Sequence, residues 1–173
     1  MMHEIEMYVV DSASAGSIGD PGSRTFLIQG RKDDQVVSVL VEKQQVELLA
    51  TQSIEFLDSI KTDYPEEKVA TPEQFDSAGE ITHADPLFRA NAIGLIFDPS
   101  NQLVTLELRE KPVEEDLDDE QMDDEYVVRL TMTRSQLRAM AVKGNQAVMA
   151  GRELCPLCQN PMNTSGHVCP RLN

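Results

Sequence analysis

The chain passes directly from a strand pattern to a helix pattern in Val37-Ser-Val-Leu-Val-Glu-Lys-Gln-Gln-Val-Glu-Leu-Leu-Ala50, and again in Val128-Arg-Leu-Thr-Met-Thr-Arg-Ser-Gln-Leu-Arg-Ala-Met-Ala141. Both pieces carry a basic residue at the second helical position, followed by a glutamine and an aliphatic residue. The match predicts an α+β domain of two β-β-β-α halves, related by a pseudo-twofold axis. The alternative is coincidence, because strand-to-helix junctions share local patterning.

The other apolar segments complete these halves, which we place at about residues 1–62 and 87–150. Alternating apolar residues predict strands, and a three-to-four-residue period predicts a helix at the end of each half. The expected strands cover 4–10, 24–29, 36–41, 88–97, 102–109 and 126–132, and the expected helices cover 42–61 and 133–150. We expect a glycine- and serine-rich loop at 11–23, a linker at 63–86 and an acidic loop at 113–125.

Two features of the second expected helix are specific. Thr133, with Gln136 three residues later, predicts a capping box at the helix start. Gly144 predicts a kink or a close packing contact, because glycine costs about 1 kcal/mol relative to alanine inside a helix.

The C-terminal tail, residues 151–173, contains all three cysteines and one of the three histidines. Cys155 and Cys158 are spaced as Cys-x-x-Cys, and His167 and Cys169 follow as His-x-Cys. Thiolate and imidazole are the ligands that zinc prefers, so this set predicts a Cys3His zinc site. Four protein ligands leave no open coordination position, which favours a structural zinc over a catalytic one.

Two other interpretations of the tail remain open. Cys155 and Cys158 could form a redox pair, or the same four ligands could hold an iron–sulfur centre. A secretory disulfide framework is excluded by the odd number of cysteines. So short a tail cannot build an apolar core, and we therefore expect it to be disordered without its metal.

Composition indicates one domain at 1–150 plus this tail. The sequence has no apolar run of membrane-spanning length and no recognisable targeting signal, so we expect a cytoplasmic protein without membrane contact. The net charge is −15, but the first 126 residues hold nine Lys or Arg against twenty-nine Asp or Glu, whereas the last 47 hold six against one. The simpler interpretation is that the two parts neutralise each other across the fold; the alternative is an interaction surface.

Other candidate sites are weaker. The glycine-rich loop offers backbone N–H groups at Gly19 and Gly22 and a guanidinium at Arg24, which together suit an anion. Phosphate loops usually open a helix, however, whereas this loop leads into an expected strand. The competing interpretation is a connection between strands that needs positive φ angles. The acidic run at 114–125 lacks the glycine and the ligand spacing of an EF-hand, so we expect a solvated loop rather than a calcium site.

Catalysis and nucleic-acid binding find little support. His3 and His83 accompany no pattern of a nucleophile with a base. Basic residues in the last part of the chain could contact phosphates: Arg134, Arg138, Arg152 and Arg171. The overall negative charge opposes binding to a polyanion, and no aromatic-rich strand motif offers base stacking.

Three stretches carry a resemblance: Gly19-Asp-Pro-Gly-Ser-Arg-Thr-Phe26, Val41-Glu-Lys-Gln-Gln-Val46, and the tail with its Cys-Pro-Leu-Cys and Gly-His-Val-Cys-Pro-Arg motifs. Through them the chain resembles an uncharacterised bacterial family, mostly from high-GC Gram-positive bacteria, with a zinc-ribbon-like C-terminal tail. The resemblance covers most of the chain and implies no reaction.

We therefore expect a zinc-binding module that recognises a protein partner or a small anionic ligand. The first alternative is an enzyme, or an enzyme subunit, that acts on a phosphorylated metabolite through the glycine-rich loop. The second is a nucleic-acid-binding regulator.

Overall fold

The computed structural model describes residues 1–82, 85–111, 124–151, 153–162 and 166–172. The expected acidic loop and His83 therefore lie almost wholly outside the described residues. The elements, in chain order, are β1 (Met2–Met7), β2 (Ser12–Ile18), β3 (Thr25–Lys32), β4 (Gln35–Val41), α1 (Lys43–Ser59), α2 (Pro72–Ser77), β5 (Ala92–Asp98), β6 (Leu103–Arg109), β7 (Glu125–Thr133) and α3 (Arg134–Met149).

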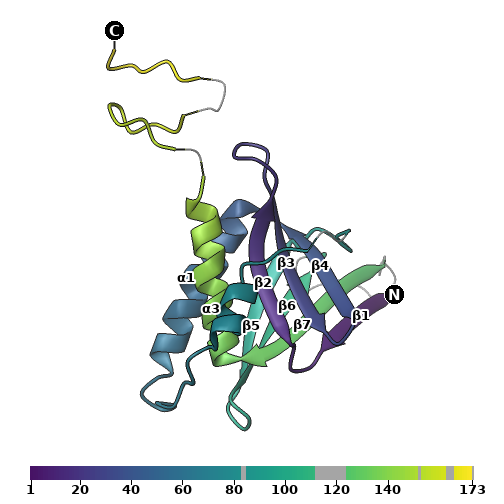
Figure 1. Ribbon diagram of the computed structural model, residues 1–173. Helices are drawn as coiled ribbons and strands as arrows, with labels where there is room; N and C mark the ends of the chain where they lie inside the picture. The colour runs from purple at the N-terminus through teal and green to yellow at the C-terminus, as the bar shows by residue number, and fades with distance from the viewer. Residues whose placement is uncertain (83–84, 112–123, 152, 163–165, 173) are drawn as a thin grey trace.

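The strands form two sheets, and the helices cover one side of them (Figure 1). One sheet is the antiparallel meander β2-β3-β4. In the other sheet, β5-β6-β7 is also an antiparallel meander, and β1 runs parallel to β7 at its edge. Helices α1 and α3 pack against each other, and α3 also packs against β2. The predicted α+β class, with a C-terminal Cys/His cluster, is confirmed.

Two expectations for the first half were wrong, one about a loop and one about strand pairing. The residues of β2, Ser-Ala-Ser-Ala-Gly-Ser-Ile, were expected to form part of a loop, because they belong to a stretch rich in glycine and serine. Small side chains suit this strand since it lies directly against α3 and α2. The expected first strand, β1, does not join its own half but pairs with β7.

Two further expectations were incomplete. The expected linker contains α2, which begins with a capping box formed by Thr71 and Gln74. The strand expected at 88–97 begins only at Ala92, while Phe88 and Ala90 hydrogen-bond to Leu40 at the edge of β4.

The two sheets meet face to face in the apolar core. A Cβ at Gly30 of β3 would lie 2.5 Å from Leu130 Cδ2 of β7, so glycine permits a contact that alanine would obstruct. A glycine also allows a close contact in α3. A Cβ at Gly144 would lie 3.1 Å from Val46 of α1 and 3.2 Å from Ala15 of β2. Of the two interpretations of Gly144, the close packing contact is the one observed.

The two main helices begin in the same way. Thr133 and Gln136 form the predicted capping box of α3, and Glu42 and Gln45 form one at the start of α1. Each glutamine also reaches out of its own half. Gln136 Nε2 donates to Val10 O at 3.0 Å, and Gln45 Nε2 donates to Ala90 O at 3.0 Å.

These two acceptors belong to equivalent segments, which we call the lead-in segments: residues 8–11 before β2 and residues 87–91 before β5. Each lies beside the last strand of the other meander. Val10 N donates to Thr131 O of β7 at 2.9 Å, and Ala90 N donates to Leu40 O of β4 at 2.9 Å. Thr131 and Leu40 coincide when the two strand-to-helix sequences are aligned. The matched hydrogen bonds support the pseudo-twofold repeat, which stays a prediction.

The acidic and basic parts of the chain are joined by ion pairs. Arg129 Nε lies 2.7 Å from Glu107 Oε2, and Arg138 Nε lies 2.6 Å from Glu67 Oε1. Arg134 donates to the backbone oxygens of Tyr64 and Glu66. These contacts favour the interpretation that the two parts neutralise each other. Among the helices of the described residues, none combines the length and the apolar character needed to span a bilayer.

The Gln136 side chain is buried, and its removal would leave Val10 O without this donor. We expect Gln136→Ala to lower the free energy of unfolding by about 1–3 kcal/mol, the usual cost of an unsatisfied buried polar group. Urea denaturation measures the change. The control is Gln146→Ala, an exposed glutamine of the same helix, which should change stability by less than about 0.5 kcal/mol. Equal effects of the two substitutions would contradict the role given to Gln136.

Candidate metal centre

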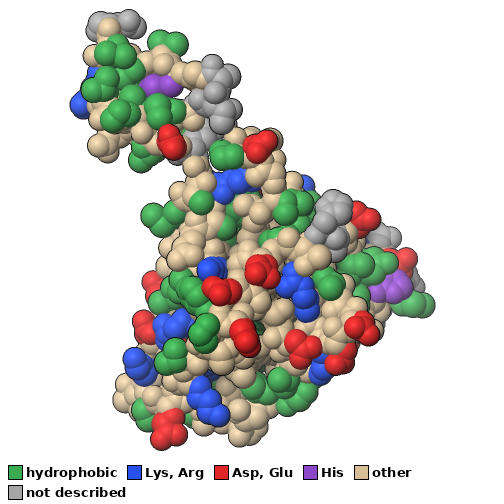
Figure 2. All heavy atoms as spheres, viewed as in Figure 1, with side chains coloured by type: hydrophobic (Ala, Val, Ile, Leu, Met, Phe, Trp, Pro, Cys, Tyr) green, Lys and Arg blue, Asp and Glu red, His purple; other side chains and the backbone are tan. Residues whose placement is uncertain are grey.

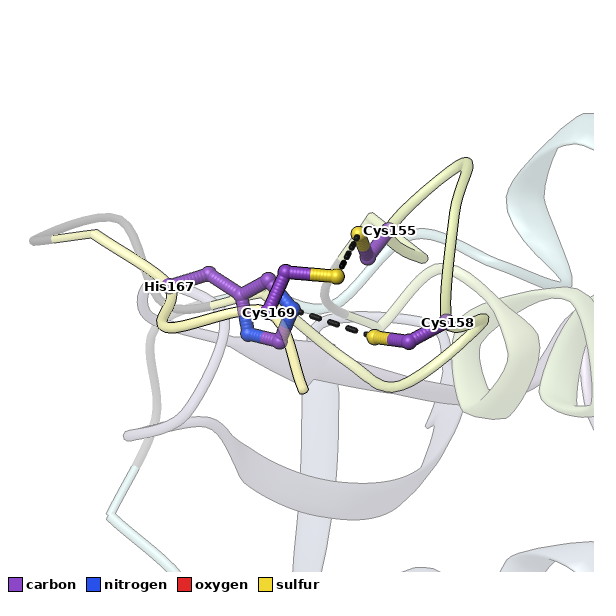
Figure 3. A group of neighbouring side chains, drawn as sticks. All are labelled: Cys155, Cys158, His167 and Cys169. Carbon is purple, nitrogen blue, oxygen red and sulfur yellow. Dashed lines mark hydrogen bonds between the residues drawn. The ribbon is translucent and has the colours of Figure 1, made fainter. Parts of the chain in front are cut away.

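The four predicted ligands come together in the tail (Figure 3). Their ligand atoms all lie within 4.8 Å of one another. Cys155 Sγ is 3.8 Å from Cys169 Sγ, and Cys158 Sγ is 3.2 Å from His167 Nε2. Cys155 and Cys169 are buried, while Cys158 and His167 are half-buried. The fold thus brings the Cys-x-x-Cys and His-x-Cys motifs together in one partly buried cluster.

The spacing of the sulfur atoms suits a shared metal ion. Two thiolates at about 2.3 Å from a tetrahedral zinc lie about 3.8 Å apart, which is the separation of Cys155 and Cys169. A disulfide needs about 2.05 Å between sulfurs, and all three cysteines are free thiols. The cluster can therefore hold a metal ion with four protein ligands and no open position.

The first two ligands sit on a small hairpin. Leu154 and Pro161 form an antiparallel bridge, and Cys155 N donates to Asn160 O at 2.9 Å. Gln159 N donates to Cys155 O at 2.8 Å and closes the turn between the two cysteines and the returning strand. Gln159 has a φ of 63°, a left-handed conformation that glycine adopts most readily.

Backbone donors stabilise negative charge on one sulfur. Hydrogen bonds from the backbone N–H groups of Cys158 and Leu157 lower the pKa of Cys155 to about 6, so its thiolate forms near neutral pH. The backbone N–H of Asn160 acts to lower the pKa of Cys158, but burial and the neighbouring Cys155 outweigh it, and the net direction is upward. A cysteine binds a metal ion as the thiolate, and the backbone donors of this turn favour the thiolate of Cys155.

The predicted anion loop connects β2 to β3 and does not open a helix. Gly19 and Gly22 have φ angles of 94° and 97°, as the competing interpretation of a strand connection requires. Arg24 extends away from this loop, and its Nη1 donates to Ala147 O near the end of α3 at 2.5 Å. Its guanidinium carbon lies 5.0 Å from the centroid of the Phe26 ring. An anion site formed by Gly19, Gly22 and Arg24 stays a prediction.

Sequence reasoning missed two features near the tail. The first is the set of backbone donors to Cys155, which the Cys-x-x-Cys spacing could have suggested. The second is a cleft between the domain and the tail, whose cationic residues Lys43 and Arg89 lie far from Arg24 in sequence. No local pattern connects these three positions.

A comparison with known protein families finds a match over most of the chain. The sequence model of a family described as a protein of unknown function, DUF3090, matches residues 5–169. The chain belongs to this family. The matched span includes both halves of the domain and all four residues of the cluster, so the DUF3090 model covers the tail together with the fold that carries it. No curated protein and no solved structure matches the chain.

The cluster predicts the consequence of removing one ligand. We expect the purified protein to hold about one zinc per chain and His167→Ala to lose it, because three ligands no longer close the tetrahedron. His3→Ala is the matched control, since this histidine lies in β1, and its metal content should equal that of the wild type. Metal analysis by mass spectrometry, with circular dichroism of the domain, checks both. Equal zinc in the two variants would show that His167 is no ligand.

The backbone at Gln159 offers a second test. A left-handed non-glycine residue costs about 1 kcal/mol, so Gln159→Gly should tighten zinc binding about fivefold. Gln159→Val should weaken it, because a branched side chain suits this conformation least. Competition with a chromophoric chelator measures the affinities. Unchanged affinity in both variants would mean that the turn is not formed around the metal.

Proposed function

We propose that this protein is a zinc-binding recognition module, in which a structural Cys3His zinc holds the tail as a surface for a protein partner or a small anionic ligand. The observation that carries the proposal is the closed cluster. Four protein ligands fill a tetrahedral coordination sphere, so the ion shapes the tail rather than activating a substrate. Three thiolates with one imidazole suit zinc among the common divalent ions.

The tail has the surface of a docking module. It projects from the end of α3 as a separate lobe on which hydrophobic side chains are prominent (Figure 2). Leu157, Val168 and Leu172 are 45%, 84% and 72% exposed, whereas Cys155 and Cys169 of the same tail are buried. Apolar side chains gathered on so small a lobe favour contact with another protein.

The arrangement supports binding over catalysis. In the cleft beside the tail, Glu42 is the carboxylate among the described lining residues, and it forms an ion pair with Arg89. A paired, exposed carboxylate is a weak candidate for a general base. The arginines considered for nucleic acid, Arg134 and Arg138, are engaged by groups of the domain itself, which argues against the regulator.

A surface variant that keeps its zinc tests the docking surface. We expect Leu157→Glu with Val168→Glu to retain one zinc per chain and to lose partners captured by cross-linking in the native host. His167→Ala should lose the same partners, because the surface is no longer held. The control is Val69→Glu, at an exposed apolar residue before α2, which should retain them. Identical captured proteins in all variants would refute docking through the tail.

A further inference from the structure

A cleft of about 600 Å³ lies where the tail joins the domain. Its walls come from the loop before β3, the start of α1, the end of α3 and the hairpin of the tail. This volume lies within the range of sites for small organic ligands. Lys and Arg side chains lie directly beneath the tail lobe in Figure 2.

The cleft reverses the charge of the chain. Its lining includes three cations, Arg24, Lys43 and Arg89, against the single carboxylate of Glu42. The chain as a whole carries −15. A local excess of positive charge can attract an anionic ligand.

Two of the cations approach a common point. Arg24 Nη2 lies 3.6 Å, and Lys43 Nζ lies 3.9 Å, from the position that a Cβ would take at Gly151. The two charged groups are therefore at most about 7.5 Å apart. A phosphate group with hydrogen bonds of about 2.8 Å to each side spans such a gap.

The charged groups differ in how far they are already engaged. The Lys43 ammonium group has no hydrogen-bond or ion-pair partner among the described residues. Arg24 is held in place by its bond to Ala147 O and by the Phe26 ring, and this leaves guanidinium N–H groups over for a ligand. Arg89 is neutralised by Glu42. The cleft thus offers two uncompensated positive charges, one of them fixed in orientation.

We propose that the cleft between the domain and the tail binds a small phosphate monoester, with the phosphate between Arg24 and Lys43 and an apolar body against Phe26 and Leu154. This assignment rests on the proposed function and names the class of its anionic ligand. A phosphate monoester carries close to two negative charges at neutral pH, which match the two uncompensated cations. The apolar side chains of Phe26 and Leu154 in the lining favour an organic phosphate over the inorganic ion.

The metal site and the cleft share one hairpin. Leu154 and Pro161 line the cleft and form the bridge that frames Cys155. Zinc fixes this hairpin, so it also fixes one wall of the ligand site. Binding of the phosphate monoester should therefore be weaker in metal-stripped protein, and the ligand should in turn raise the affinity for zinc measured against a chelator.

Phenyl phosphate is the probe, and isothermal titration of the zinc-loaded protein measures its affinity. We expect Lys43→Gln to weaken binding at least about tenfold, since a charge-assisted hydrogen bond is lost. Gly151→Asp should weaken it further, because a carboxylate would occupy the point between the two cations. The control is Lys61→Gln, beyond the opposite end of α1, which should bind within about twofold of wild type.

The comparison of probes separates the parts of the assignment. Phenyl phosphate should bind more tightly than inorganic phosphate and than benzoate, and its affinity should fall with added salt. Equal binding of benzoate would overturn the assignment of a dianion. Equal binding of inorganic phosphate would overturn the apolar subsite. An affinity for phenyl phosphate that Lys43→Gln and Gly151→Asp leave unchanged would overturn the cleft as its site.

The proposal for the cleft and the proposal for the zinc-held tail are contradicted by different results. A protein with one zinc per chain that shows no binding of phenyl phosphate would overturn the cleft and leave the recognition module intact. A protein without zinc that binds phenyl phosphate in a Lys43-dependent manner would support the cleft and overturn the structural zinc.

Discussion

The fold depends on an exchange between its two halves. Each lead-in segment runs beside the last strand of the other meander. A glutamine in the first turn of the helix that follows this last strand donates a hydrogen bond to the lead-in segment. Gln45 and Gln136 each donate to a backbone oxygen of a buried residue, Ala90 and Val10, and each also closes the capping box of its own helix. Neither half is complete alone, because the outer edges of β4 and β7 are covered by chain from the opposite half.

The position of α3 follows from this exchange and determines where the tail lies. With its start fixed at Val10, the helix passes between α1 and β2, where Gly144 allows the three elements to touch. Near its end, Ala147 O accepts a hydrogen bond from Arg24. A cation at the C-terminal turn of a helix is favourable because the exposed carbonyl groups carry partial negative charge. The tail therefore leaves the domain beside Arg24, and the cleft forms between them.

The distribution of charge acquires its meaning only in three dimensions. Counted along the chain, positive charge is concentrated after residue 126. In the structure, Arg129 and Arg138 of that part form ion pairs with Glu107 and Glu67. The cations that line the cleft without an ion pair, Arg24 and Lys43, both come from the acidic part. Surface charge that can attract a ligand is thus what remains after the fold has paired the rest, and a sequence count does not report it.

The features that the sequence determined are those set by neighbouring residues. The candidate metal cluster was evident because its three cysteines and one histidine lie within fifteen residues, and the start of α3 was evident because a capping box spans only four. Apolar period placed both long helices and most of the strands. The strand β2 was missed because its small residues are specified by the helix that packs on them. The pairing of β1 with β7, the helix within the expected linker and the cleft were also left to the tertiary structure. Each of these depends on residues far apart in the chain, and only packing and hydrogen bonding in the folded state bring them together.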